Sequence, residues 1–183
     1  MKKIIYITNL PAFYKTNLLN AISEKADVFV IYTHLTDPNR KSDFFKGKKK
    51  FKHHTLTPDK RWKNILFLFN KIKNESYDEL IIGGWDLFYF WICLFLGSSK
   101  SNALVVESSI YESKFSGIAG LMKRLFLSRI GKVYASGTTQ KKLCDALGYK
   151  GVYKITKGVG LFNIIPQPSF KIKDKVHKFL YVG

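Results

Sequence analysis

The segment Glu79–Glu107, ELIIGGWDLFYFWICLFLGSSKSNALVVE, contains a strand–helix–strand unit that decides the fold. Its first four residues form a short strand-like run, apolar after Glu79, that stops at Gly83-Gly84, and Ala103–Glu107 is a second such run, apolar up to its final glutamate. Between them, Leu87–Leu96 is continuously apolar, which is typical of a buried helix. Because the two strand-like runs are mostly apolar and do not alternate, we expect a parallel sheet that helices cover on both faces.

The same alternation continues on either side of this segment. Further strands are expected at Lys2–Thr8, Asp27–Thr33, Phe51–Leu56, Lys132–Ala135 and Gly151–Ile155, and further helices at Tyr14–Lys25, Arg61–Asn74, Gly117–Ser128 and Thr138–Leu147. This pattern predicts an α/β fold with a doubly wound, Rossmann-like parallel sheet of six to seven strands and helices on both faces. The ligand crevice of such a sheet lies at the carboxyl ends of its strands.

The alternation stops after Ile155. We expect a first domain over residues 1–163, an interdomain linker over 164–178 that carries Pro166, Pro168 and several lysines, and a new strand over 179–183. A strand that ends in Gly183 is how a second doubly wound domain would begin. We therefore interpret the chain as the truncated first part of a two-domain protein.

The composition combines a large positive charge with a high apolar content. The 183 residues include 31 Lys and Arg against 13 Asp and Glu, a net charge of +18, while 46% of residues are hydrophobic. That apolar content excludes an intrinsically disordered basic tail. The charge favours anionic lipid, nucleic acid or phosphorylated substrates as partners. A lysine-rich host proteome, with no specific partner, is the alternative explanation.

Metal sites, membrane spans and export signals are not expected. Cys93 and Cys144 lie in no CxxC motif or Cys/His cluster. The longest apolar run, Leu87–Gly97, has 11 residues, whereas a spanning helix needs about 20. The apolar run at the amino terminus is interrupted at Thr8-Asn9, too early for a signal peptide. We predict a cytoplasmic protein.

Four segments, in this order, resemble the amino-terminal half of GT-B glycosyltransferases, and glycosyltransferase family 4 in particular. They are Leu10–Lys15 (LPAFYK), Tyr77–Gly84 (YDELIIGG), Val133–Gly148 and Ile155–Phe162 (ITKGVGLF). The first looks like the Pro–aromatic–basic start of many bacterial surface-polysaccharide transferases. The resemblance implies that the chain is the acceptor-binding domain of a hexosyltransferase. Such an enzyme would transfer a sugar from a nucleotide-sugar donor to a lipid-linked glycan, with retention of configuration at the anomeric carbon.

The chain also departs from the pattern of that family. Asn9–Ala12 stands where many members have a Gly-Gly pair, Glu107-Ser108 stands where many have a His, and Thr156-Lys157 replaces Pro-Asn. The family's donor-binding residues lie in its second domain. The resemblance therefore implies that the nucleotide sugar binds mainly in a carboxyl-terminal half, that no other cofactor takes part, and that this chain is inactive alone.

Candidate site residues lie where strands end at the expected crevice. Glu107 is the candidate catalytic residue, because a carboxylate there could orient or deprotonate an acceptor hydroxyl; capping of the following loop is the alternative. Asp86 could cap the next helix or bind the acceptor. Gly83-Gly84 would allow either a close backbone approach or a tight turn. The other candidates for acceptor binding are Pro11, Phe13, Tyr14, Lys15, Trp85, Ser108 and Tyr111, and those for an interdomain cleft are Ser136, Gly137, Lys157 and Gly158.

Two basic amphipathic helices suit an anionic membrane surface, so we expect a peripheral protein at the inner face of the cytoplasmic membrane. The residues expected to contact lipid are Arg61, Trp62, Lys63, Lys71, Lys123, Arg124 and Arg129. The alternative is that these helices face the core and expose only their lysines. A nucleic-acid-binding module is a further alternative, which is disfavoured because no basic recognition motif with interleaved aromatic residues is present. A non-catalytic peripheral membrane module also stays open.

Overall fold

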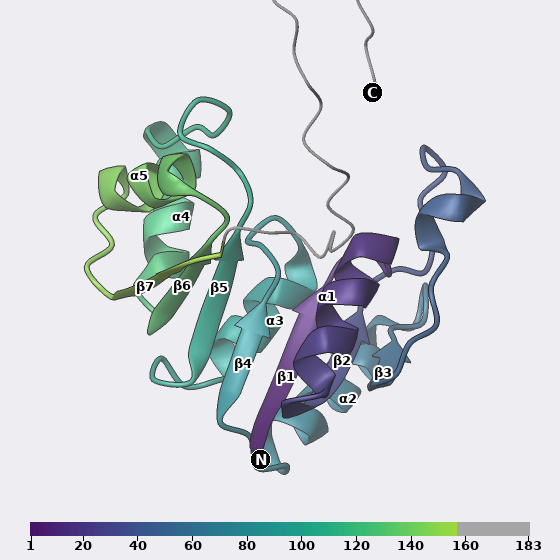
Figure 1. Cartoon of the computed structure of the whole chain (residues 1–183). Helices are drawn as coiled ribbons and strands as arrows, with labels where there is room; N and C mark the ends of the chain where they lie inside the picture. Colours follow the sequence, from purple (N-terminus) through teal and green to yellow (C-terminus); the bar gives the residue numbers. More distant parts are fainter. Residues whose placement is uncertain (157–183) are drawn as a thin grey trace, which may run out of the picture.

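The computed structural model describes residues 1–156, which alternate between strands and helices as the sequence predicts (Figure 1). The strands are β1 (Lys2–Thr8), β2 (Ala26–Tyr32), β3 (Lys52–Thr55), β4 (Glu79–Ile82), β5 (Asn102–Val106), β6 (Lys132–Ala135) and β7 (Val152–Ile155). The helices are α1 (Phe13–Ser23), α2 (Arg61–Lys73), α3 (Phe88–Leu96), α4 (Gly117–Leu127) and α5 (Thr138–Ala146), with a short 3-10 helix at Ser42–Phe45. The expected boundaries at residues 163 and 178, and the strand over 179–183, lie outside the described residues.

The seven strands are all parallel and run in the order β3-β2-β1-β4-β5-β6-β7. The chain moves outward from β1 to β3, crosses back to β4 and continues in the opposite direction to β7. The direction therefore reverses between β1 and β4, where Ile7 lies beside Ile82 in the register. This confirms the doubly wound α/β sheet, and the switch point is where such sheets bind ligands.

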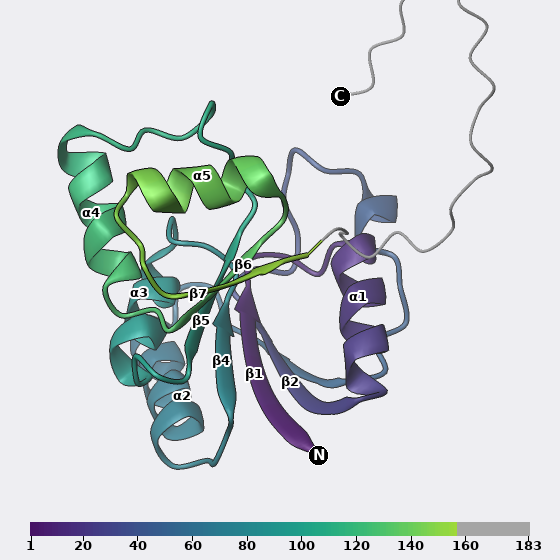
Figure 2. The ribbon, with the colours of Figure 1, turned by 60° about the vertical axis from the view of Figure 1, so that its left-hand side comes forward.

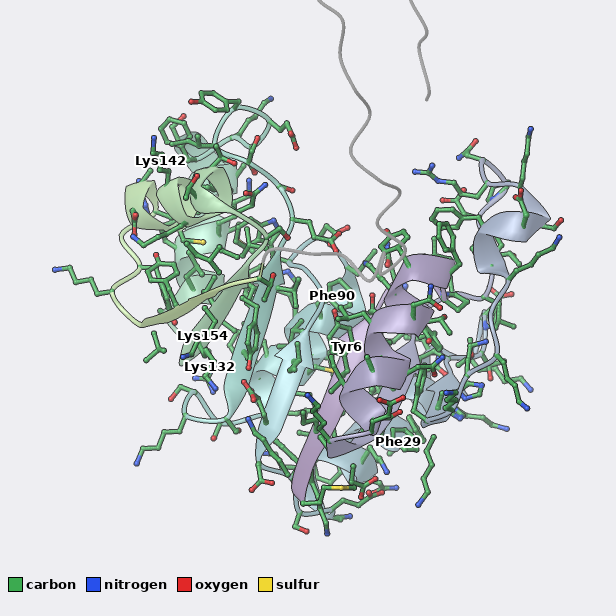
Figure 3. The ribbon with its side chains drawn as sticks, viewed as in Figure 1. Tyr6, Phe29, Phe90, Lys132, Lys142 and Lys154 are labelled. Carbon is green, nitrogen blue, oxygen red and sulfur yellow. The ribbon has the colours of Figure 1, made fainter. Side chains whose placement is uncertain are left out.

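The helices cover the two faces of the sheet unequally (Figure 2). On one face, Leu68 of α2, Phe90 of α3, Phe126 of α4 and Leu143 of α5 join the strands in one buried core. On the other face, α1 packs with Leu19 on β1 and β2. The right-handed crossover explains this division, since connections that run in opposite directions along a sheet lie on opposite faces. Figure 3 marks Phe90 and Tyr6, which belong to these two cores.

A buried carboxylate ties together the first residues of three strands. Glu79 begins β4 and accepts hydrogen bonds from the ammonium groups of Lys2 and Lys132, the latter at 3.0 Å, and from the Tyr134 hydroxyl at 2.8 Å. Burial raises the pKa of Glu79, but the hydrogen bonds from Lys2, Tyr134 and Lys132 outweigh it, and the net pKa lies below the ordinary value. The network is therefore held together by an ionised carboxylate.

The apolar residues of α2 divide between the core and the surface. Ile72 is buried together with Asn64 and Leu68, whereas Trp62, Leu66 and Phe69 are exposed. Apolar residues surround much of this helix, so their spacing alone does not identify the buried face. Of the two roles considered for Asp86, capping of α3 is wrong: the N-cap position is Leu87, and no side chain caps that helix.

No helix within residues 1–156 is both long and apolar enough to span a bilayer. In the same part of the chain, no three His, Cys, Asp or Glu side chains lie close enough together to hold a metal ion. Burial raises the pKa of the Cys93 thiol strongly and that of Cys144 to about 12, so both thiols are protonated at neutral pH.

Candidate functional site

A cavity of about 220 Å³ lies at the switch point, where β1, β4 and β5 end. It brings together seven of the residues predicted from the sequence: Lys15, Gly83, Gly84, Trp85, Asp86, Glu107 and Ser108. Asn9, Phe90, Val105 and Val106 complete its lining. The cavity thus joins residues from segments almost 100 positions apart in the sequence, because parallel strands end at the same edge of the sheet.

A lysine and a carboxylate form an ion pair in the wall of this cavity. Lys15 lies in the first turn of α1 and is only 7% exposed, and its ammonium lies 3.5 Å from Oε1 of Glu107. The same ammonium donates long hydrogen bonds of 3.4 Å to Oγ1 of Thr8 and to Oδ1 of Asn9. Glu107 directly follows β5, and 48% of its side chain is exposed. The buried cation therefore holds the carboxylate in place while leaving it accessible to a ligand.

The charge of Glu107 also acts on two neighbouring phenols. Burial raises the pKa of Tyr6, and the negative charge of Glu107 raises it further. The pKa of Tyr14 is raised by the same two causes in the same order. Both hydroxyls therefore stay protonated at neutral pH, and neither can act as a base.

The first residue of the glycine pair after β4 serves a close backbone approach. A Cβ atom on Gly83 would lie 2.9 Å from the carbonyl oxygen of Ile7 and 3.2 Å from Oγ1 of Thr8. A Cβ atom on Gly84 would lie 2.7 Å from Oδ1 of Asp86. Neither glycine has a positive φ. At Gly83 the close backbone approach is therefore the correct interpretation, and it brings the ends of β1 and β4 together, whereas Gly84 approaches only side chains.

Trp85 is held at the edge of the cavity by α3 and α4. Its carbonyl oxygen accepts a hydrogen bond of 2.9 Å from the indole of Trp91, and the Lys123 ammonium lies 5.2 Å from the centre of its ring system. Lys123 also donates hydrogen bonds to Ser113 and to the carbonyl of Lys114. Burial lowers the pKa of Lys123. This lysine, expected at a membrane surface, thus contacts the loop between β5 and α4.

A second cavity, of about 300 Å³, lies on the other side of the ion pair. Lys15 and Glu107 line both cavities, so the pair forms part of the wall between them. The second cavity is mainly apolar and is lined by Tyr6, Tyr14, Leu18, Ile22, Ile81, Val105 and Tyr134, with Ser136 and Thr156 at the strand ends. Of the residues expected at an interdomain cleft, Ser136 lines this cavity and Gly137 is the N-cap of α5. Lys157 and Gly158 lie outside the described residues.

Four predicted acceptor-binding residues do not line the first cavity, and one of them, Tyr14, lines the second cavity instead. Tyr111 is 83% exposed in the loop before α4. Pro11 is buried before α1, and Phe13 packs edge-on against Tyr14 and Phe44. A larger cavity of about 340 Å³ lies at the opposite edge of the sheet, which parallel sheets do not use for ligands.

Asn9 and Phe90 line the first cavity but were not predicted as site residues. Asn9 could have been found, because it is the polar residue that directly follows an apolar strand. Phe90 could not, because its sequence context is uniformly apolar.

No family model matches the sequence, and no curated protein matches it significantly. Solved structures share its fold, and two of them illustrate the likeness. The UDP-GlcNAc 2-epimerase of Methanocaldococcus jannaschii has a TM-score of 0.54 and 15% identity over 85% of this chain and 45% of its own. A Listeria monocytogenes protein described as a UDP-N-acetylglucosamine 2-epimerase has a TM-score of 0.51 and 13% identity over 81% of this chain and 43% of its own.

The chain therefore spans less than half the length of either protein. At these identities the likeness shows the Rossmann-like fold alone, and it does not distinguish glycosyltransferase family 4 from other families that share this fold.

Proposed function

We propose that this chain is the acceptor-binding half of a glycosyltransferase that transfers a sugar from a nucleotide-sugar donor to a lipid-linked glycan in bacterial surface-polysaccharide synthesis. The observation that carries the proposal is the ion pair of Glu107 and Lys15 in the wall of the switch-point cavity. The order of the sequence segments that resemble family-4 transferases supports it. Two structural neighbours named for a sugar nucleotide, UDP-GlcNAc, are compatible with it.

The carboxylate of Glu107 would accept a hydrogen bond from the acceptor hydroxyl and aim its oxygen at the donor sugar. Such positioning lowers the entropic part of the barrier. In a retaining reaction no separate protein base is required, so the proposed role of Glu107 is to position the hydroxyl, and the Lys15 ammonium at 3.5 Å would hold the carboxylate in place. Trp85 would offer an aromatic surface to the sugar ring at the edge of the cavity.

The size of the cavity limits what it would hold. Its volume of about 220 Å³ lies below the roughly 300–1,000 Å³ of sites for drug-sized ligands, so it would take one sugar ring. The rest of a lipid-linked acceptor would lie outside it. The nucleotide of the donor would bind a carboxyl-terminal half, across a cleft that Ser136, Gly137, Lys157 and Gly158 would line. The chain alone would then not turn over.

The first test is to read the DNA that flanks the coding segment. The proposal expects a second Rossmann-like, nucleotide-binding half, in the same frame or as a neighbouring gene. If no such half is encoded there and none exists as a separate chain, the proposal fails.

The second test is kinetic. The chain joined to that second half should transfer a radiolabelled sugar to extracted lipid acceptors. Glu107→Gln should lower kcat/KM by about 100-fold, the loss expected when a reacting group is misplaced by about 1 Å. Lys25→Gln, an exposed lysine after α1, is the matched control and should leave kcat/KM unchanged. Unchanged transfer by Glu107→Gln would remove the proposed role of this carboxylate.

A further inference from the structure

Three neighbouring helices expose apolar side chains that the core does not use. Trp62, Leu66 and Phe69 lie on α2, Phe88 and Phe95 on α3, and Ile118, Leu121, Met122 and Leu125 on α4. We call these nine residues the outer helical face. Ile118, Trp62 and Leu121 are exposed by 82%, 77% and 62%. The four residues of α4 follow the spacing i, i+3, i+4, i+7, which defines one stripe along a helix.

The outer helical face is additional to the core, because each of its helices already buries another side. Leu68 and Ile72 face inward on α2, as do Cys93 and Leu94 on α3 and Phe126 on α4. The helices also lie next to one another: α2 packs on α3, and Trp91 of α3 meets Phe126 of α4 edge-on at 4.9 Å. Figure 2 shows α2, α3 and α4 along one side of the sheet, opposite α1. Exposed apolar side chains gathered on neighbouring helices are typical of interaction sites.

The charges on these helices indicate the partner. α2, α3 and α4 contain no Asp or Glu, and their basic residues are Arg61, Lys63, Lys71, Lys73, Lys123 and Arg124. The guanidinium of Arg61 lies 5.4 Å from the centre of the Phe88 ring, and that of Arg129 lies 5.2 Å from the Phe95 ring. Cations at the rim of exposed aromatic and aliphatic side chains are the arrangement found in helices that lie in the interface of an anionic bilayer.

Not every predicted cation belongs to this surface. Lys71 pairs with Glu75 and lies 3.6 Å from the centre of the Phe29 ring, and Lys123 contacts the loop before α4. Arg129 is half-buried beside the Phe95 ring, whereas Arg61, Lys63, Lys73 and Arg124 are exposed. These four exposed cations therefore remain to face anionic headgroups.

We infer that the outer helical face docks in the headgroup region of an anionic lipid bilayer. Helices in this fold begin at the edge of the sheet where strands end, so Trp62, Phe88 and Ile118, near the first residues of their helices, lie toward the edge that holds the Glu107 cavity. A docked bilayer would then lie beside the mouth of that cavity. The docking itself does not depend on the chemistry of Glu107.

Vesicle flotation tests the inference with the whole chain. Vesicles of phosphatidylcholine with phosphatidylglycerol should bind it, and vesicles of phosphatidylcholine alone should bind it far more weakly. Trp62→Glu and Leu121→Glu should each weaken binding about tenfold, because each removes a large apolar group from the interface. Arg124→Gln should weaken it about fivefold, which corresponds to about 1 kcal/mol per basic residue near an anionic surface.

Matched variants outside the outer helical face are the controls. Leu35→Glu replaces an apolar side chain that is 59% exposed in the loop after β2, and Lys25→Gln removes an exposed charge after α1. Both should bind vesicles as the unchanged chain does, and so should Glu107→Gln, even if the proposed transfer chemistry fails.

Three results would overturn the inference. The first is equal binding to both kinds of vesicle, and the second is a loss of vesicle binding in the control variants equal to that in the test variants. The third is that the unchanged chain does not bind vesicles but forms a dimer in vesicle-free solution, which Leu121→Glu dissociates. The last result would identify the surface as an interface between copies of the chain.

Discussion

Replacement of Glu107 by glutamine should destabilise the fold more than replacement of its partner Lys15 by methionine. Lys15 is almost fully buried, so its ammonium has lost most of its hydration. Without Glu107 the ammonium would keep only the two long hydrogen bonds to Thr8 and Asn9. Without Lys15 the carboxylate would still be hydrated, because 48% of the Glu107 side chain is exposed. When one partner of a partly buried ion pair is removed, the fold loses stability chiefly because the remaining charge stays buried without compensation.

The distance between the two groups sets the magnitude. At 3.5 Å, the attraction between unit charges is about 1 kcal/mol at the dielectric constant of water and about 5 kcal/mol at an effective value of 20. Because Glu107 is half exposed, solvent screening puts the pair near the lower limit. Glu107→Gln should therefore lower the free energy of unfolding by about 1–2 kcal/mol, and Lys15→Met should change it by less than about 1 kcal/mol.

Urea unfolding followed by far-UV circular dichroism measures both values, with Ser108→Ala as an uncharged control from the same cavity. The double variant should be about as stable as Lys15→Met alone, because glutamine causes no loss once the ammonium is absent. The reasoning would be refuted if Lys15→Met cost as much as Glu107→Gln, or if the two losses were simply additive.

Three further predictions concern the rest of the fold. Gly83→Ala should cost about 1–3 kcal/mol in thermal unfolding, because its Cβ would lie 2.9 Å from the Ile7 carbonyl; an unchanged Tm would contradict the close approach. The pKa of Glu79 is lower in the folded chain than its ordinary value of 4.5, so the ionised carboxylate stabilises the fold at pH values above 4.5. This contribution is lost as the pH falls from 4.5 through the folded-state pKa. Glu79→Gln should therefore flatten the acid side of the profile of unfolding free energy against pH, and an unchanged slope would contradict the network. On α4, Leu121→Glu should change stability by less than about 0.5 kcal/mol, whereas Phe126→Ala should cost about 3–5 kcal/mol; similar losses in chemical denaturation would show that the two faces of α4 are wrongly assigned.

The sequence predicts the sheet well because its strands are buried on both sides. Runs such as Leu80–Ile82 are apolar at consecutive positions, and only a covered parallel sheet explains several of them between helices. The buried face of α2 could not be predicted from spacing, because Trp62, Leu66 and Phe69 are as apolar as the residues that the core uses. Which apolar residues are buried depends on how α2 packs on the sheet and on α3, and spacing within one helix does not contain that information.

The candidate site was predictable in its location but not in its contacts. Strand ends identified Gly83, Gly84, Glu107 and Ser108, because polar or small residues there interrupt apolar runs. The burial of Lys15 was not foreseen, since a lysine in the first turn of a helix is usually solvated. Its pairing with Glu107 joins positions 92 residues apart and follows only from the strand order, which places β5 two strands from β1.

The most direct test of the central claim is an NMR titration of the isotopically labelled chain with a water-soluble acceptor analogue, a hexose linked to farnesyl diphosphate. The account predicts amide shift changes that centre on Asn9, Gly83, Gly84 and Glu107, and binding at least about tenfold weaker for Glu107→Gln, which is a loss of about 1.4 kcal/mol. Shift changes confined to the outer helical face, or equal affinity of Glu107→Gln, would contradict an acceptor site at the switch point.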